Sequence, residues 1–202
     1  MFSTSFLHIL QGKDPLEEKL IKVDTRKIGE TDLESIIHTM PYFLQGIKRE
    51  QFLIETTPDY YISRDSKTNT VYMCFKEILM LDFDNTTETQ LNLLETLPLA
   101  FKIYHTSKGY HAFCISKKYE YRSKETLEFM LQFKDSGVDI DYIRFCYLRG
   151  FCVRLNKKFE QKSENYTLYK VIKSELINPE LEKLVDLHFK KCKDYKNDLN
   201  IN

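Results

Sequence analysis

Residues 78–84 read Ile78-Leu79-Met80-Leu81-Asp82-Phe83-Asp84, an apolar run that ends in two carboxylates. Four consecutive apolar residues bounded by charge predict a buried strand. Alternate residues on a strand share a face, so both carboxylates can point at one cation. Mg²⁺ and Mn²⁺ suit such a site because they prefer oxygen ligands and keep positions open for phosphate. The alternative is a strand that ends in a polar loop, with residues 85–87 capping the next helix.

A second polar cluster follows, and it reads Thr106-Ser107-Lys108-Gly109-Tyr110-His111. It lies between two strand-like segments, residues 100–104 and 110–115. Lys108-Gly109 predicts a tight hairpin in which Gly109 takes a positive φ. His111 would then stand near the start of the return strand, with Thr106 or Ser107 opposite. Hydroxyls, a cation and a histidine in one hairpin are typical of phosphate binding.

Length and charge limit the possible functions. With 202 residues, of which 42% are hydrophobic, the chain can bury one good core and is expected to form one domain. Its 30 basic and 30 acidic residues cancel, which excludes a global positive field that would attract nucleic acid. Binding of nucleic acid would need a local patch. Residues 154–173 supply a basic and aromatic one that includes Lys157, Lys158, Tyr166 and Tyr169.

The cysteines and the hydropathy indicate where in the cell the protein is located. Five cysteines without a CxxC pair predict reduced, mostly buried thiols in an intracellular protein. His188 and Cys192 form a single HxxxC pair, which without a second pair does not predict a zinc site. No segment approaches the roughly 18 apolar residues of a membrane span. We therefore expect a soluble protein in the cytoplasm, or at a replication site if the protein is viral, with no membrane partner.

The order of the expected elements predicts the fold class. Residues 1–50 look mainly helical, residues 60–173 form the core, residues 178–191 form a C-terminal helix, and residues 196–202 form a flexible tail. Within the core, the strand at 78–82 is followed by a helix at 87–97, the hairpin, a helix at 123–133, a short helix at 142–148, and strands at 151–155 and 166–172. This order predicts an α+β fold with an RRM-like split β-α-β core and an antiparallel sheet, flanked by the N-terminal helices and further strands. We expect residues 1–195 to form a single domain.

One enzymatic alternative shares the first motif. Residues 82–86 fit the DxDxT signature of haloacid-dehalogenase-like phosphatases, in which Asp82 would be the nucleophile and Asp84 a general acid. Ser107 and the Asp139/Asp141 pair would stand in for the later motifs of that family. In those phosphatases, however, the hydroxyl-bearing strand is parallel and leads into a crossover helix, whereas Lys108-Gly109 predicts a direct turn into another strand.

The whole set of motifs resembles the archaeo-eukaryotic primase superfamily, the catalytic domain of primases and primase-polymerases. The strand that ends in DxD in that family is similar to Glu77 through Asp84, including the acidic residue before the apolar run. Its S-G-x-G-x-H signature resembles Thr106 through His111. Its hydrophobic-Asp motif, followed later by an arginine, resembles Val138-Asp139 or Ile140-Asp141 followed by Arg154-Leu155. The chain departs from the family after Leu155, where it reads Asn156-Lys157-Lys158.

The resemblance implies a template-dependent nucleotidyltransferase that uses two divalent metal ions, Mg²⁺ or Mn²⁺. The metal ligands and catalytic residues would be Asp82, Asp84 and one of Asp139 or Asp141. The nucleotide would be held by Thr106, Ser107, Lys108, His111 and Arg154, and the nucleic acid by Lys157, Lys158, Tyr166 and Tyr169. The implied partners are nucleoside triphosphates, a single-stranded DNA template and a helicase or other replication protein. A non-catalytic nucleic-acid-binding protein of the same fold is the remaining alternative.

Overall fold

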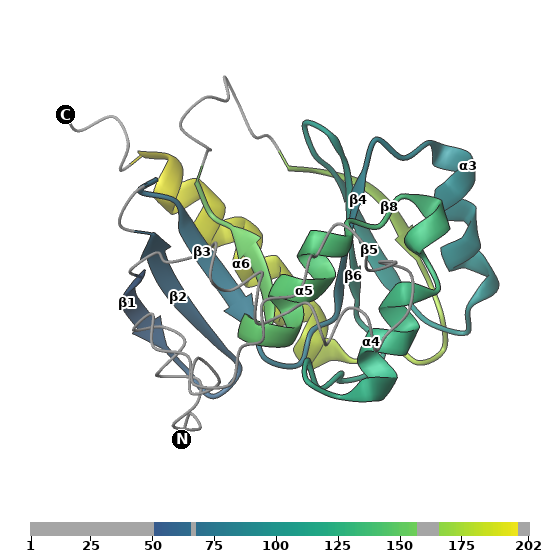
Figure 1. The fold of residues 1–202 in the computed structure, drawn as a ribbon, viewed down its shortest axis with the longest axis horizontal. Coiled ribbons are helices and arrows are strands. Elements are labelled where there is room, and N and C mark those ends of the chain that lie inside the picture. The colour runs from purple at the N-terminus through teal and green to yellow at the C-terminus, as the bar shows by residue number, and fades with distance from the viewer. Residues whose placement is uncertain (1–50, 66–67, 157–165, 198–202) are drawn as a thin grey trace, which may run out of the picture.

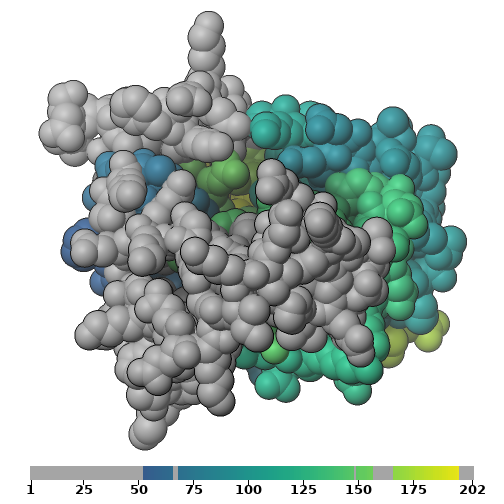
Figure 2. Space-filling model, viewed as in Figure 1, coloured from purple at the N-terminus to yellow at the C-terminus, as the bar shows by residue number. Residues whose placement is uncertain are grey.

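The computed structural model describes residues 51–65, 68–156 and 166–197, which form two four-stranded sheets with helices around them (Figure 1). In the same orientation, the space-filling view places β1 to β3 at one end of the molecule and α3 at the other (Figure 2). The helices expected within residues 1–50 lie outside the described residues. In chain order the elements are β1 (Gln51–Thr56), β2 (Tyr60–Asp65), β3 (Val71–Phe75), β4 (Met80–Asp84), α3 (Glu88–Leu91), η3 (Asn92–Thr96), β5 (Phe101–His105), β6 (Gly109–Cys114), α4 (Lys124–Leu131), η4 (Lys134–Ser136), α5 (Ile140–Arg149), β7 (Phe151–Arg154), β8 (Thr167–Ile172) and α6 (Pro179–Asn197).

The second sheet contains the predicted core. Its strand order is β4-β6-β5-β8, and every neighbouring pair is antiparallel. Because β4 and β5 both run antiparallel to β6, they run parallel to each other with β6 between them. The crossover from β4 to β5 is made by α3 and η3. This is a split β-α-β arrangement, so the predicted α+β class and antiparallel sheet are confirmed.

The first sheet was only partly expected. Its order is β1-β2-β3-β7, again with antiparallel pairs throughout. A strand pair at residues 60–62 and 71–75 and a strand at 151–155 are expected from the sequence and correspond to β2, β3 and β7, but nothing in the sequence indicated β1 or a sheet separate from the core. β1 was missed because residues 52–54 are three consecutive exposed apolar side chains without alternation.

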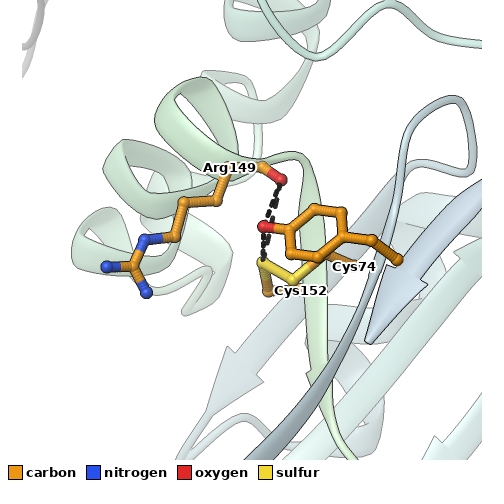
Figure 3. Close-up of a disulfide and its surroundings, with 4 residues drawn as sticks. Cys74, Arg149 and Cys152 are labelled. Carbon is orange, nitrogen blue, oxygen red and sulfur yellow. Dashed lines mark hydrogen bonds between the residues drawn. A yellow bond between two sulfur atoms is a disulfide. The ribbon is translucent and has the colours of Figure 1, made fainter. Parts of the chain in front are cut away.

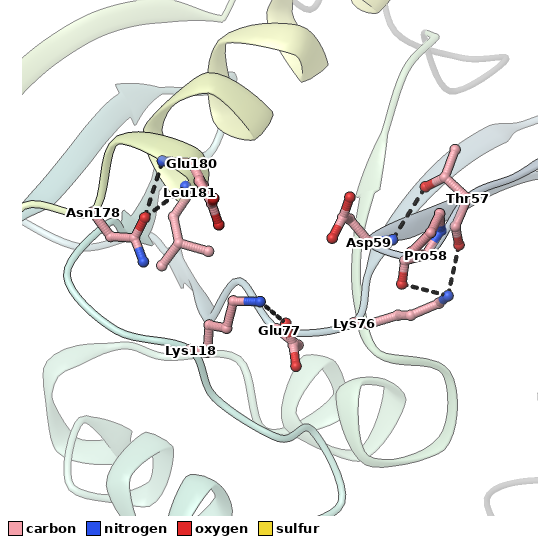
Figure 4. Close-up of polar contacts among 9 residues, drawn as sticks. All are labelled: Thr57, Pro58, Asp59, Lys76, Glu77, Lys118, Asn178, Glu180 and Leu181. Carbon is pink, nitrogen blue, oxygen red and sulfur yellow. Dashed lines mark hydrogen bonds and ion pairs between the residues drawn. The ribbon is translucent and has the colours of Figure 1, made fainter.

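A short link carries the chain from the first sheet to the second. In this link, Lys76 donates from Nζ to the carbonyl oxygens of Thr57 and Pro58, both at 2.6 Å, and Lys118 pairs with Glu77 at 2.7 Å (Figure 4). These contacts tie the turn before β2 and the loop after β6 to the link. They fix where β4 begins, and β4 carries the two carboxylates.

Helix α6 packs against both sheets. Its Lys191 binds Glu55 on β1 at 2.7 Å, and its Asp186 binds Lys102 on β5 at 2.6 Å. Asn178 caps the start of the helix by accepting the Glu180 N–H at 3.0 Å (Figure 4). Buried side chains from both sheets and from α6 form one hydrophobic cluster. The helix runs to Asn197 rather than ending at 191, and it includes residues 196–197 of the expected tail, whose remaining residues lie outside the described part of the chain. No helix among the described residues is long and apolar enough to cross a membrane.

Two cysteines are paired, which corrects the prediction that all five are reduced. Cys74 on β3 and Cys152 on β7 are directly opposite each other in the ladder and form a disulfide (Figure 3). Beside it, the hydroxyl of Tyr61 donates to the carbonyl oxygen of Arg149 at 3.0 Å. The pairing was not predictable because their sequence separation of 78 residues gives no local signal. Cys114, Cys146 and Cys192 are free and buried.

Candidate functional site

A carboxylate on the edge strand β4 and a histidine on its neighbour β6 face each other in the second sheet. Asp82 on β4 is the cross-strand partner of His111 on β6, and Asp82 Oδ1 lies 3.3 Å from His111 Nε2. The side chains are 21% and 12% exposed, so both are largely sheltered from water but still reachable. Asp82 lies within β4 rather than at its end, and Asp84 is two residues further along on the same face. This face is opposite to that of Phe83, whose ring packs against Phe133.

Nearby positive charge keeps Asp82 ionised. Burial would raise the pKa of Asp82. The neighbouring His111 outweighs this effect, together with the charges of Arg154 and Lys108, so the pKa stays below its usual value. Arg154 comes from β7 in the first sheet and Lys108 from the hairpin between β5 and β6. A carboxylate, a histidine and two cations from three separate segments therefore act on one another at this point.

The hairpin has a different geometry from the one predicted. Gly109 does not have a positive φ. It is needed because a Cβ there would lie 1.8 Å from the carbonyl oxygen of Phe83 on β4. The hydroxyl oxygen of Thr106 accepts the N–H groups of Gly109 at 3.0 Å and of Lys108 at 3.3 Å. Thr106 thus stabilises the turn, while Ser107 and Lys108 are exposed at its tip. The residue opposite His111 on β5 is Tyr104 rather than Thr106 or Ser107.

Residues 137–139 bring a further carboxylate to the outer edge of β4. The N–H of Asp139 donates to the carbonyl oxygen of Asp82 at 2.8 Å, and the N–H of Asp84 donates to that of Gly137 at 3.0 Å. Phe83 and Val138 form an antiparallel bridge between these bonds. This short ladder places Asp139 beside Asp82, although the two residues are far apart in the sequence.

Asp139 and Asp141 have different surroundings. Asp139 is the N-cap of α5, and its carboxylate accepts the N–H of Asp141 at 2.8 Å. Burial raises the pKa of Asp139 against the effect of this bond, and the charge of Asp82 adds to the rise. Asp141 is 59% exposed and binds Arg144 at 2.7 Å. Asp139 is therefore the carboxylate of the pair that is electrostatically coupled to Asp82.

The two tyrosines predicted to hold nucleic acid lie on opposite faces of the sheet. The ring of Tyr166 packs against His111, with 5.4 Å between ring centroids. Tyr169 instead packs against Tyr110 at 5.0 Å and its hydroxyl binds Glu88. Because Tyr110 and His111 are adjacent on β6, their side chains point to opposite faces. Of the two tyrosines, Tyr166 therefore contacts the histidine of the site, and Tyr169 lies on the other face of the sheet. Lys157 and Lys158 lie outside the described residues.

The described residues contain no group of three or more His, Cys, Asp or Glu side chains arranged to hold a metal ion. The pair of Asp82 and Asp139 nevertheless has the right donor chemistry for Mg²⁺ or Mn²⁺. Burial is the main cause of the raised pKa of Asp139, and the charge of Asp82 adds to it, which is a repulsion between carboxylates that a bound cation would relieve. Asp84 would be the third oxygen donor, on the same face of β4 as Asp82.

No protein-family model matches the chain, and no curated protein or solved structure is significantly similar to it.

Sequence reasoning considered His188 on α6 only as half of a possible zinc pair and missed its place next to the site. It is completely buried, and burial lowers its pKa to about 3, so the ring is neutral near pH 7. Its ring centroid lies 5.7 Å from that of Tyr166, the tyrosine that packs against His111. The signal that would have found it is the spacing of the buried residues of α6, Leu181, Val185, His188 and Cys192, which puts the histidine on the apolar stripe.

Substitution of the two α5 aspartates should separate their roles. We expect Asp139→Asn to weaken Mn²⁺ binding roughly tenfold to a hundredfold, the cost of losing one charge-assisted contact. Asparagine caps helices as well as aspartate does, so stability should hardly change. Asp141→Asn should leave Mn²⁺ affinity unaltered, because the exposed Asp141 carboxylate binds Arg144 rather than facing Asp82. Titration with Mn²⁺ checks both variants, and equal losses in the two would contradict the assignment of Asp139.

Proposed function

We propose that the protein is a template-dependent nucleotidyltransferase of the primase-polymerase type. The observation that carries this proposal is the cross-strand pair of Asp82 and His111, with Asp139 at the edge of the same strand. Carboxylates beside a histidine and two cations suit a nucleoside triphosphate with its metal ions. The resemblance of the sequence motifs to the archaeo-eukaryotic primase superfamily points to the same chemistry.

Each residue has a role in this proposal. Asp82, Asp84 and Asp139 would hold Mg²⁺ or Mn²⁺, which when bound neutralises the triphosphate and activates the attacking 3′-hydroxyl. Arg154 and Lys108 would bind phosphate oxygens through charge-assisted hydrogen bonds. His111, held in place by Asp82 and Tyr166, would donate a further hydrogen bond to the nucleotide. Thr106 would act indirectly, by fixing the turn that presents Lys108.

The antiparallel sheet weighs against the phosphatase alternative. That alternative requires a parallel strand that ends at Ser107 and leads into a helix, whereas β5 turns directly into β6 through residues 106–108. In addition, Asp82, the residue that would be the phosphatase nucleophile, lies within a strand and contacts His111. The phosphatase mechanism would need its nucleophile at the free end of a parallel strand, and Asp82 is not placed in that way.

Nucleotide binding should depend on His111 and Arg154. We expect His111→Ala and Arg154→Ala each to weaken binding of a labelled nucleoside triphosphate in Mn²⁺ about ten- to a hundredfold, because each removes one hydrogen bond to a charged group. Single-stranded DNA binding should be spared if the template lies beyond these residues. Lys124→Ala is the matched control, since Lys124 is exposed on α4 and pairs only with Glu128 among the contacts described.

The same titration separates the enzyme from the non-catalytic alternative. A wild-type protein that binds single-stranded DNA but shows no metal-dependent nucleotide binding would favour a nucleic-acid-binding protein of the same fold. If His111→Ala and Arg154→Ala bind nucleotide as tightly as Lys124→Ala does, His111 and Arg154 do not belong to the proposed site.

A further inference from the structure

Strand β7 is at the edge of the first sheet. It pairs with β3 on one side, and none of the described strands pairs with its other side. Its last residue, Arg154, is opposite Tyr72 in the ladder. The outward-facing backbone groups of an edge strand need partners of another kind when they are buried. The position of Arg154 therefore depends on what covers the outer edge of β7.

Two side chains of α6 cover that edge. His188 Nε2 lies 3.3 Å from the carbonyl oxygen of Arg154, and Cys192 Sγ lies 3.8 Å from the same oxygen. His188 and Cys192 are one helical turn apart, and Nε2 and Sγ are 3.5 Å from each other. A carbonyl oxygen only accepts hydrogen bonds, so His188 donates to it in the tautomer that carries the proton on Nε2. The two side chains thus contact a backbone carbonyl that a neighbouring strand would otherwise bind.

The ring of His188 is also fixed by aromatic neighbours. Its centroid lies 5.8 Å from that of Phe113 and 5.7 Å from that of Tyr166. Tyr166 in turn packs against His111. Within the described part of the chain, His188 Nδ1 has no hydrogen-bond partner. An apolar side chain would avoid leaving a buried nitrogen unpaired, so the feature that distinguishes histidine here is its bond to Arg154.

We propose that His188, assisted by Cys192, is a positioning residue that fixes the end of β7 and thereby aims the Arg154 side chain at the nucleotide. The inference rests on the proposed function, because it assigns a purpose to Arg154 in nucleotide binding. His188 itself does not touch the nucleotide. His188 acts through Arg154 itself: it binds the Arg154 backbone carbonyl, and the Arg154 side chain is attached to the same backbone.

Two amide variants test the role of the bond. In His188→Gln, the side-chain N–H lies as many bonds from Cβ as Nε2 does in histidine, so the bond to Arg154 can form. In His188→Asn, the N–H is one bond shorter and cannot replace Nε2. We expect His188→Gln to bind nucleotide in Mn²⁺ within about threefold of wild type, and His188→Asn about tenfold more weakly, as for the loss of one anchoring hydrogen bond. Val185→Ala, on the same buried stripe of α6, is the control for lost packing alone, and its nucleotide affinity should match wild type.

A double-mutant cycle shows whether His188 acts through Arg154. In an Arg154→Ala background, His188→Asn should weaken nucleotide binding no further, because the side chain that it aims is gone. Additive effects of the two substitutions, or equal affinities of His188→Gln and His188→Asn, would overturn the positioning role.

Hydrogen exchange tests the anchor independently of nucleotide. The N–H of Leu155 donates to the carbonyl oxygen of Val71 at 2.8 Å, directly after Arg154. We expect this amide to exchange faster in His188→Asn than in His188→Gln, relative to core amides of β6 in the same protein. Equal exchange would overturn the anchor itself. The Leu155 amide could exchange faster in His188→Asn than in His188→Gln while the wild type binds no nucleotide in Mn²⁺. In that case the proposed function fails, and the role in aiming Arg154 fails with it.

Discussion

Replacement of both β4 carboxylates, Asp82→Asn with Asp84→Asn, is expected to abolish metal-dependent nucleotidyl transfer. Metal ions contribute several kcal/mol to such reactions, so the rate should fall by about 10³-fold or more. Binding of Mn²⁺ should be lost in parallel, because only the carboxylate at position 139 would remain of the proposed ligands. Nucleotide incorporation and Mn²⁺ titration measure the two effects.

The double variant should remain folded. Asparagine at position 82 keeps an oxygen that can accept a hydrogen bond from His111, so we expect a change in unfolding free energy of about 1 kcal/mol. Asp59→Asn is the matched control, since Asp59 is exposed in the turn before β2. Full transfer activity in the double variant, with a normal melting curve, would remove the metal site from β4.

Reduction of the Cys74–Cys152 disulfide is expected to have the largest effect on stability. The bond closes a loop of 78 residues, for which the chain-entropy relation gives a stabilisation of up to about 4.5 kcal/mol. For a protein of this size, such a loss corresponds to a fall in melting temperature of roughly 9–18 °C. Thermal melts with and without reductant measure it. A Cys74→Ser, Cys152→Ser variant should melt at the lower temperature under both conditions.

Counting thiols tests the pairing itself. Protein that is denatured and alkylated without reductant should carry three labels, on Cys114, Cys146 and Cys192, and five after reduction. Five labels without reductant would show that Cys74 and Cys152 are reduced as purified. No change in melting temperature on reduction would mean that the bond contributes nothing to stability.

Local patterns predicted much of the second sheet. The apolar run before Asp82 and the turn at Lys108-Gly109 gave β4 and the β5–β6 hairpin within one or two residues. The helix predicted at 123–133 forms over Lys124–Leu131, and Ser123 caps it by accepting the N–H of Thr126. These elements were predictable because capping, turn formation and strand burial depend on neighbours in the sequence.

Contacts between distant segments were harder to predict. The motifs left Asp139 and Asp141 as equal candidates, and only the ladder from Gly137 to Asp139 along β4 separates them. Similarly, Tyr166 and Tyr169 looked equivalent until the side on which each packs was known. The role of Gly109 also depends on β4, because the atom that excludes a Cβ belongs to Phe83. In each case a pairing between strands decides the outcome, and no local pattern encodes it.

The proposed nucleotidyl transfer is tested most directly by extension of a labelled primer on a single-stranded DNA template. The full chain would be supplied with Mg²⁺ or Mn²⁺ and with ribonucleotides or deoxyribonucleotides, and release of phosphate from a monoester would be measured alongside. We expect metal-dependent addition of template-matched nucleotides, lost in the Asp82→Asn, Asp84→Asn variant, and no release of phosphate. Phosphate release that depends on Asp82, with no extension under any metal or nucleotide condition, would contradict the proposed function.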